Sequence, residues 1–171
     1  QYIKKLFSSR VIIYNTSWRF ICKVINFEFK WNAAQNSYEE LFSRYSSILN
    51  DQLKGYGTMN YVSSHDDGEP FDKERTKPFE SATKLLLCPG TSQVYYGDES
   101  ARTLIIEGAV GDANLRSNMN WHEIENNEKT KEILAHWQKL GKFRSNHPSV
   151  GAGVHKMISE APYVFERTFS Q

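Results

Sequence analysis

Apolar and polar residues follow two different periods along the chain, and these periods predict a regular order of strands and helices. Short apolar runs at residues 24–29, 59–63 and 92–96 are too brief for helical periodicity, which indicates strands. Longer stretches after each run place apolar residues three and four positions apart, as in amphipathic helices. This alternation favours parallel strands joined by crossover helices, which is an α/β fold. Residues 154–169 then predict two further short strands.

Each of the three predicted helices has a recognisable start. Ser37 and Glu40 have the spacing of a capping box before the first helix. Pro78 suits the first turn of the second helix, and Asn126 or Asn127 can cap the third. The apolar stripes of these helices are expected to pack in the core.

The composition fits a soluble globular protein. The 171 residues are 39% hydrophobic with a net charge of +1, and no apolar run approaches the roughly 20 residues of a membrane helix. We therefore expect neither a membrane nor a nucleic-acid partner. Cys22 and Cys88 could form a disulfide, but Cys88 follows three leucines and is expected to be a buried free thiol.

Residues 1–23 differ from the rest of the chain. They contain five basic and no acidic residues and show no clear apolar period. We assign no element to this segment, and we expect the chain, which begins with Gln, to be a piece of a longer protein.

The polar cluster after the second predicted strand is the main candidate for chemistry. His65 and Asp66 follow residues 59–63, and residues 97–99 (Gly-Asp-Glu) follow the third strand. Because parallel strands end at one edge of a sheet, these clusters are expected to be neighbours, as active-site residues are in alternating barrels. The alternative is that the polar residues only cap a strand.

A metal site is a second interpretation of this cluster. His65, Asp66, Asp67 and Glu69 have side chains that suit Zn²⁺ or Mn²⁺, but no second histidine cluster at ligand spacing accompanies them. We therefore assign no metal ligands. The remaining histidines are expected to be surface or structural residues: His122, His136, His147 and His155.

Four segments resemble the alpha-amylase family, glycoside hydrolase family thirteen. Residues 61–66 (Tyr-Val-Ser-Ser-His-Asp) resemble the motif of its seventh barrel strand, and residues 86–99 resemble that of the eighth. Residues 116–121 resemble its Arg-x-x-Met-x-Trp segment, and residues 140–148 its last barrel helix. Ser64 stands where the family usually has Asn.

The resemblance implies the C-terminal portion of a (β/α)8 TIM barrel, strands six to eight, over residues 24–150. Residues 151–171 would begin an all-β C-terminal domain, and residues 1–23 stay unassigned. It also implies a glycosidase whose parent cleaves alpha-glucosidic bonds in starch-like glucans with retention, acting on starch and maltooligosaccharides.

The resemblance also implies roles for three residues. Asp66 matches the carboxylate that stabilises the transition state, and His65 matches a substrate-binding histidine. Arg116 either binds sugar or pairs with a carboxylate. Tyr95 and Tyr96 are expected to pack in the barrel, and Glu99 to support its loop.

Two catalytic groups of the family have no match in this chain. The nucleophile Asp and the acid/base Glu belong to the fourth and fifth strands, yet no Asp precedes Asp51 and no Glu precedes Glu28. We expect the chain to be inactive alone. No cofactor is assigned here. Calcium would belong to earlier segments of the parent enzyme, and a secreted or periplasmic parent fits a starch substrate.

An alternative is a non-catalytic carbohydrate-binding protein, in which Trp121 and His65 contact sugar without turnover.

Overall fold

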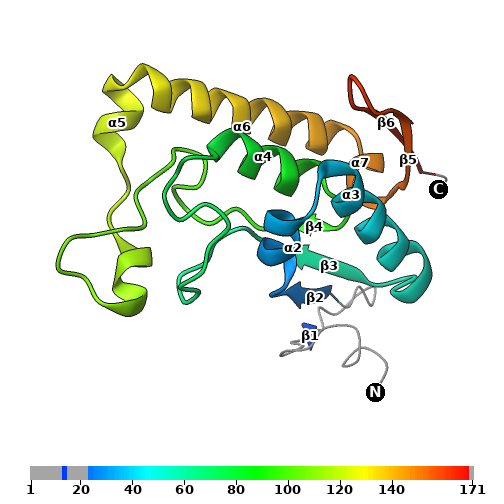
Figure 1. Ribbon diagram of the computed structural model, residues 1–171, viewed down its shortest axis with the longest axis horizontal. Helices are drawn as coiled ribbons and strands as arrows, with labels where there is room; N and C mark the ends of the chain where they lie inside the picture. Colours follow the sequence, from blue (N-terminus) through cyan, green and yellow to red (C-terminus); the bar gives the residue numbers. More distant parts are fainter. Residues whose placement is uncertain (1–12, 15–22, 170–171) are drawn as a thin grey trace.

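The computed structural model describes residues 13–14 and 23–169, and it contains a sheet of four short strands (Figure 1). In sheet order these are β1 (Ile13–Tyr14), β2 (Lys23–Asn26), β3 (Gly57–Asn60) and β4 (Thr91–Ser92). β1 pairs antiparallel with β2, whereas β2, β3 and β4 run parallel. The predicted parallel α/β arrangement is therefore confirmed.

The helices are α2 (Phe29–Gln35), α3 (Tyr38–Ser47), α4 (Pro78–Leu87), α5 (Trp121–Asn126), α6 (Glu128–Asn146) and α7 (Ser149–Ala152). Their predicted starts are confirmed. Ser37 Oγ accepts a hydrogen bond from the amide of Glu40, whose carboxylate accepts one from the amide of Ser37. Asn127 caps α6 by accepting from the amide of Thr130 at 3.1 Å.

The hydrophobic core lies between the sheet and the helices that cover it. Helices α2, α3 and α4 lie on one side of the strands, and α6 packs along the outside of α4 (Figure 1). Fully buried side chains from each layer meet there: Val24, Phe29, Leu41, Phe42, Tyr45 and Leu85. The aromatic stripe of α3 is therefore core, as predicted.

Buried amides tie the parallel strands together. Asn26 Nδ2 on β2 donates to Asn60 Oδ1 on β3 at 2.9 Å, and Asn60 Nδ2 donates to the carbonyl oxygen of Pro89 at 2.9 Å. Because both side chains are fully buried, these hydrogen bonds offset part of the large desolvation penalty of the two amides. The start of β4 is thereby fixed beside β3.

All three strands predicted for this sheet have wrong boundaries. Residues 24–29 do not form one strand, because β2 ends at Asn26 and α2 begins at Phe29. The Phe29 ring is buried against Tyr45, with ring centroids 5.3 Å apart. This apolar residue therefore belongs to the buried face of a helix. Short apolar runs do not distinguish a strand from a buried helix start. Residues 59–63 overlap β3 only at its last two positions.

The predicted strand at 92–96 is also wrong over most of its length, since β4 is only Thr91–Ser92. The two tyrosines, which suggested a longer strand, instead form hydrogen bonds to the following loop. The hydroxyl of Tyr95 donates to the carbonyl of Leu115, and that of Tyr96 to the carbonyl of Ser117.

The predicted C-terminal strands are confirmed as an antiparallel hairpin, β5 (Val154–Ser159) and β6 (Val164–Thr168). The hairpin packs on α3, where Phe42 contacts Phe165 with ring centroids 5.4 Å apart. The His155 side chain is buried there, and its Nε2 lies 2.7 Å from Glu39 Oε2. His155 therefore has a structural role. The domain boundary between residues 150 and 151 stays a prediction.

Cys88 is a buried free thiol, as predicted. Cys22 and the rest of the unassigned segment, apart from β1 and Lys23, lie outside the described residues.

Candidate functional site

The chain leaves the core abruptly after β3, and this exit exposes two of the predicted site residues. Ser63 and Ser64 are buried, whereas the side chains of His65 and Asp66 are 65% and 58% exposed. Ser64 Oγ donates to Asp66 Oδ1 at 2.9 Å, and His65 Nε2 lies 3.8 Å from Asp66 Oδ2. The carboxylate is therefore oriented by a neighbouring hydroxyl while it faces solvent.

The ends of β3 and β4 are neighbours, as the sequence predicted. Ser63 Oγ donates to Asp98 Oδ1 at 2.6 Å, and Arg75 Nη1 lies 2.9 Å from the same oxygen. Burial raises the pKa of Asp98, while Arg75 and the Ser63 bond oppose that rise. These contacts hold the two loops at one edge of the sheet.

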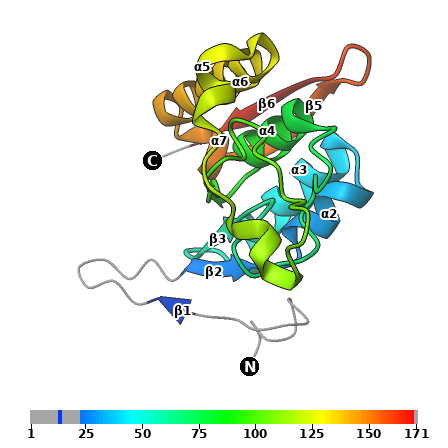
Figure 2. The same ribbon diagram turned by 90° about the vertical axis from the view of Figure 1, so that its left-hand side faces the viewer.

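Arg116 reaches this edge from a 3-10 helical turn over Gly111–Arg116. Figure 2 views the molecule from this side, with the turn facing the viewer. Arg116 Nε donates to the carbonyl oxygen of His65 at 2.9 Å, and Nη2 lies 3.9 Å from Asp112 Oδ2. The three predicted site residues therefore come together, and the guanidinium of Arg116 contacts a carboxylate and the backbone of His65.

Asp67 has a different environment from Asp66. It forms an ion pair with Lys30, whose side chain is only 2% exposed, and it accepts a hydrogen bond from the Tyr61 hydroxyl at 3.4 Å. Burial, followed by the charge of Asp67, raises the pKa of Tyr61. Sequence reasoning missed Lys30, because a lysine just after an apolar run gives no signal of burial.

This pairing bears on the alternative of a metal site. The carboxylate of Asp67 is engaged by Lys30 and by the amide of Glu69 at 3.2 Å. Within residues 13–14 and 23–169, no group of three or more His, Cys, Asp or Glu side chains is arranged to hold a metal ion.

The remaining aromatic and acidic residues named from the sequence line the loop after β4. Tyr95 and Tyr96 pack against each other with ring centroids 4.7 Å apart, and Tyr96 is partly exposed. Glu99 Oε2 accepts from the amide of Gly97 at 2.9 Å, so it supports the loop. Trp121, at the start of α5, is 67% exposed.

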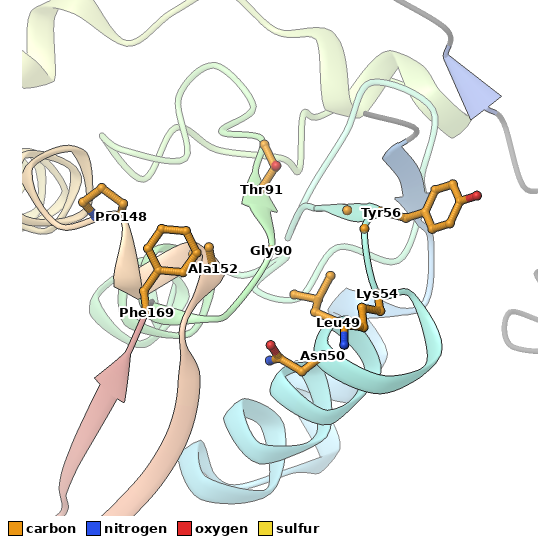
Figure 3. A pocket seen from close by; sticks show the side chains of 12 residues that line it. Leu49, Asn50, Lys54, Tyr56, Gly90, Thr91, Pro148, Ala152 and Phe169 are labelled. Atoms are coloured by element: carbon orange, nitrogen blue, oxygen red, sulfur yellow. The ribbon is translucent and has the colours of Figure 1, made fainter. Parts of the chain in front are cut away.

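A cavity of about 680 Å³ lies at the opposite, amino-terminal ends of β3 and β4 (Figure 3). Leu49, Lys54, Tyr56, Pro148 and Phe169 are among its lining residues. None of the predicted site residues lines it, so the cavity is separate from the edge that carries His65.

Known proteins share sequence and fold with parts of this chain. No protein-family model matches the chain. The periplasmic alpha-amylase of Escherichia coli (strain K12) is 35% identical over 135 residues, which are 76% of this chain and 18% of that protein. The chain thus spans about a fifth of the length of this relative. None of the helices in the described residues is long and apolar enough to cross a membrane.

Solved structures show the fold. An Anoxybacillus alpha-amylase superposes with a TM-score of 0.62 at 21% identity, covering 87% of this chain and 34% of that one. AmyP in complex with maltose superposes with a TM-score of 0.58 at 15% identity, covering 87% and 38%. The fold is therefore that of part of an alpha-amylase-type TIM-barrel enzyme. Sequence and fold together show that the chain belongs to the alpha-amylase family.

Proposed function

We propose that this chain supplies part of the substrate site of a glycosidase that cleaves alpha-glucosidic bonds in starch-like glucans with retention. The observation that carries the proposal is the convergence of His65, Asp66 and Arg116 at the carboxyl ends of the parallel strands. Active sites of closed α/β barrels lie at this end of the strands.

We further propose that β2, β3 and β4 are the sixth, seventh and eighth strands of the barrel. Their parallel order supports this assignment, with α2 and α3 between β2 and β3 and with α4 between β3 and β4. In the same proposal, residues 24–150 belong to the barrel and residues 151–171 begin a C-terminal β domain. The separate sheet of β5 and β6 supports the second part.

The proposed roles follow from the charge that develops during glycoside cleavage. The transition state resembles an oxocarbenium ion, so a fixed carboxylate at the sugar ring lowers its energy. Asp66 takes this role, because it is exposed and oriented by Ser64. His65 and Arg116 bind sugar hydroxyl groups, with the guanidinium held beside the His65 carbonyl.

We expect no turnover from the 171-residue polypeptide by itself. Retaining cleavage needs one carboxylate as nucleophile and a second as acid/base. Two other carboxylates at this edge are engaged in ion pairs, Asp67 with Lys30 and Asp98 with Arg75. The proposal therefore assigns this chain glucan binding and charge stabilisation, and it assigns the nucleophile and the acid/base to the parent's fourth and fifth strands.

The experiment combines an activity assay with calorimetry. Purified polypeptide is incubated with starch and maltotriose, and reducing sugar is measured. We expect no release, together with maltotriose binding that Asp66→Asn and Arg116→Gln both weaken. Release of reducing sugar that is lost in Asp66→Asn, or binding that neither substitution changes, would contradict the proposal.

The second candidate function is a non-catalytic carbohydrate-binding protein, and the exposed indole of Trp121 favours it. Apolar faces of aromatic rings stack on sugar rings. In this case Trp121→Ala abolishes maltotriose binding, and Asp66→Asn leaves the affinity unchanged. The glycosidase proposal predicts the reverse order of effects.

The proposal includes no metal ligand and no cofactor in this chain, and it leaves calcium to the remainder of the parent enzyme. Maltotriose affinity should therefore be the same with and without a chelator. The E. coli relative is named as periplasmic, which supports a secreted or periplasmic parent. The proposed partner is an alpha-glucan, with no nucleic acid involved.

A further inference from the structure

Arg102 is a nearly fully buried cation in the loop after β4, 1% exposed. Its guanidinium donates to the carbonyl oxygens of Tyr96 at 3.2 Å, Leu115 at 3.1 Å and Ser117 at 3.2 Å, and to the hydroxyl of Ser117. All of these acceptors are neutral oxygens. Three of these four acceptors lie on Leu115 and Ser117, the residues directly before and after Arg116.

The loop is shaped around this guanidinium. Gly97 adopts φ +87°, and a Cβ added there would lie 2.5 Å from Arg102 Nε. The guanidinium carbon lies 4.0 Å from the centroid of the Tyr96 ring, within the range of a cation–π contact. Arg75 Nε donates to the carbonyl of Arg102 at 2.7 Å, which connects this loop to the ion pair with Asp98.

The side chain of Arg116 has few contacts that could fix its orientation. Its side chain is 55% exposed, and the distance of 3.9 Å to Asp112 is that of a weak surface pair. A long side chain loses rotamer entropy when it is fixed, so a defined backbone position reduces the penalty for the bond to His65. A planar fork of five N–H donors can hold several separated carbonyls at once in a fixed geometry, whereas the three donors of a lysine all lie on one nitrogen.

We infer that Arg102 is a positioning residue, which holds the Leu115 and Ser117 carbonyls so that Arg116 contacts the backbone of His65. Its consequence for glucan affinity rests on the proposed function, whereas its effect on the conformation of His65 does not. The experiment therefore measures the two effects separately.

The first measurement is by NMR. The amide resonances of His65 and Asp66 are compared in the full chain, in Arg102→Met, in Arg116→Gln and in the double variant. Arg102→Met should move these resonances in the same direction as Arg116→Gln. The double variant should match Arg116→Gln alone, because residues that act through one contact are not additive.

Arg144→Met is the matched control. Arg144 is a part-buried arginine that also donates to neutral carbonyls, those of Leu86, Cys88 and Gly90. These residues precede β4, at the end of the strand opposite the edge that carries His65. This substitution should lower stability while leaving the His65 and Asp66 resonances in place. An equal shift in the control would mean that general destabilisation moves His65, and it would overturn the inference.

Two milder variants keep the test decisive if Arg102→Met does not fold. Arg102→Lys keeps the charge but cannot reach all three carbonyls, and Ser117→Ala removes only the hydroxyl acceptor. Both should move the His65 and Asp66 resonances part of the way toward their positions in Arg116→Gln. Unchanged resonances in a folded variant at Arg102 would overturn the inference.

The second measurement is maltotriose affinity. Arg102→Met and Arg116→Gln should each weaken binding about tenfold, which corresponds to the loss of roughly one hydrogen bond. If the wild-type chain binds no maltotriose, the proposed function fails, and the NMR comparison still decides whether Arg102 positions Arg116.

Discussion

The Ser63 hydroxyl donates a 2.6 Å hydrogen bond to the Asp98 carboxylate, and this bond joins the chain just beyond β3 to the chain beyond β4. Arg75 contacts the same carboxylate oxygen at 2.9 Å. Because only Ser64 separates Ser63 from His65 and Asp66, these contacts fix the origin of the loop that carries them. The exposed candidate site therefore rests on a buried polar cluster.

Substitution by Asn should lower the stability of the chain at Asp67 but not at Asp66. Asp67→Asn leaves the buried ammonium of Lys30 without its counter-charge and should lower the free energy of unfolding by about 3 kcal/mol. Asp66→Asn alters an exposed carboxylate and should change stability by less than about 0.5 kcal/mol while weakening maltotriose binding. Urea denaturation and calorimetry measure both effects. Equal stability of the two variants would contradict this assignment.

Gly90 should be far less tolerant of alanine than Gly55, although both have positive φ. A Cβ at Gly90 (φ +109°) would lie 2.3 Å from Thr58 Oγ1, whereas nothing lies within 4 Å of one at Gly55 (φ +86°). Gly55→Ala should therefore lower the free energy of unfolding by about 1 kcal/mol through backbone strain alone. Gly90→Ala should lower the free energy of unfolding by about 3 kcal/mol, because overpacking at the buried amides adds to that strain. Similar midpoints in urea would show that the strands are not held as described.

Arg167 should be a main contributor to docking of the β5–β6 hairpin. Its guanidinium donates to the carbonyls of Leu87 and Val150, and it lies 5.0 Å from the ring centroid of Phe42. Arg167→Met leaves buried carbonyls unpaired and should lower stability by about 2–4 kcal/mol.

The control on the same hairpin is Lys156→Met. Lys156 forms an exposed pair with Glu166, so its removal should change stability by less than about 0.5 kcal/mol. If the two variants unfold at the same urea concentration, Arg167 does not anchor the hairpin.

Cys88 should be unreactive in the folded chain. Burial raises the pKa of its thiol, although Arg167 and Arg144 act in the other direction. The thiolate is the reactive form, so at about pH 8 a chromogenic disulfide reagent should not modify Cys88 until the protein unfolds. Cys22→Ser removes the second thiol from the assay. Rapid modification of this variant under native conditions would show that Cys88 is accessible.

Sequence reasoning predicted the features that depend on local chemistry. The capping box at Ser37 and the cap at Asn127 need only residues that are three apart, and both are present. The parallel strand order followed from the alternation of apolar runs and amphipathic stretches. The motif around His65 and Asp66 indicated a candidate site, and its role stays a prediction.

Long-range partners could not be predicted in the same way. The burial of Arg102 depends on carbonyls of Leu115 and Ser117, more than a dozen residues away, and the pairing of Lys30 with Asp67 depends on how α2 packs beside β3. The predicted ends of the strands were wrong for a related reason. Hydrophobic patterns report burial, and Tyr61 and Val62 are buried although the sheet ladder ends at Asn60.

The most direct test of the central claim is an NMR titration of the isotope-labelled chain with maltotriose. The account predicts that the largest shifts occur at the amides of His65, Asp66 and Arg116. Shifts confined to Tyr56 and Phe169, which line the cavity at the opposite end of the strands, would contradict it, as would a spectrum that maltotriose leaves unchanged.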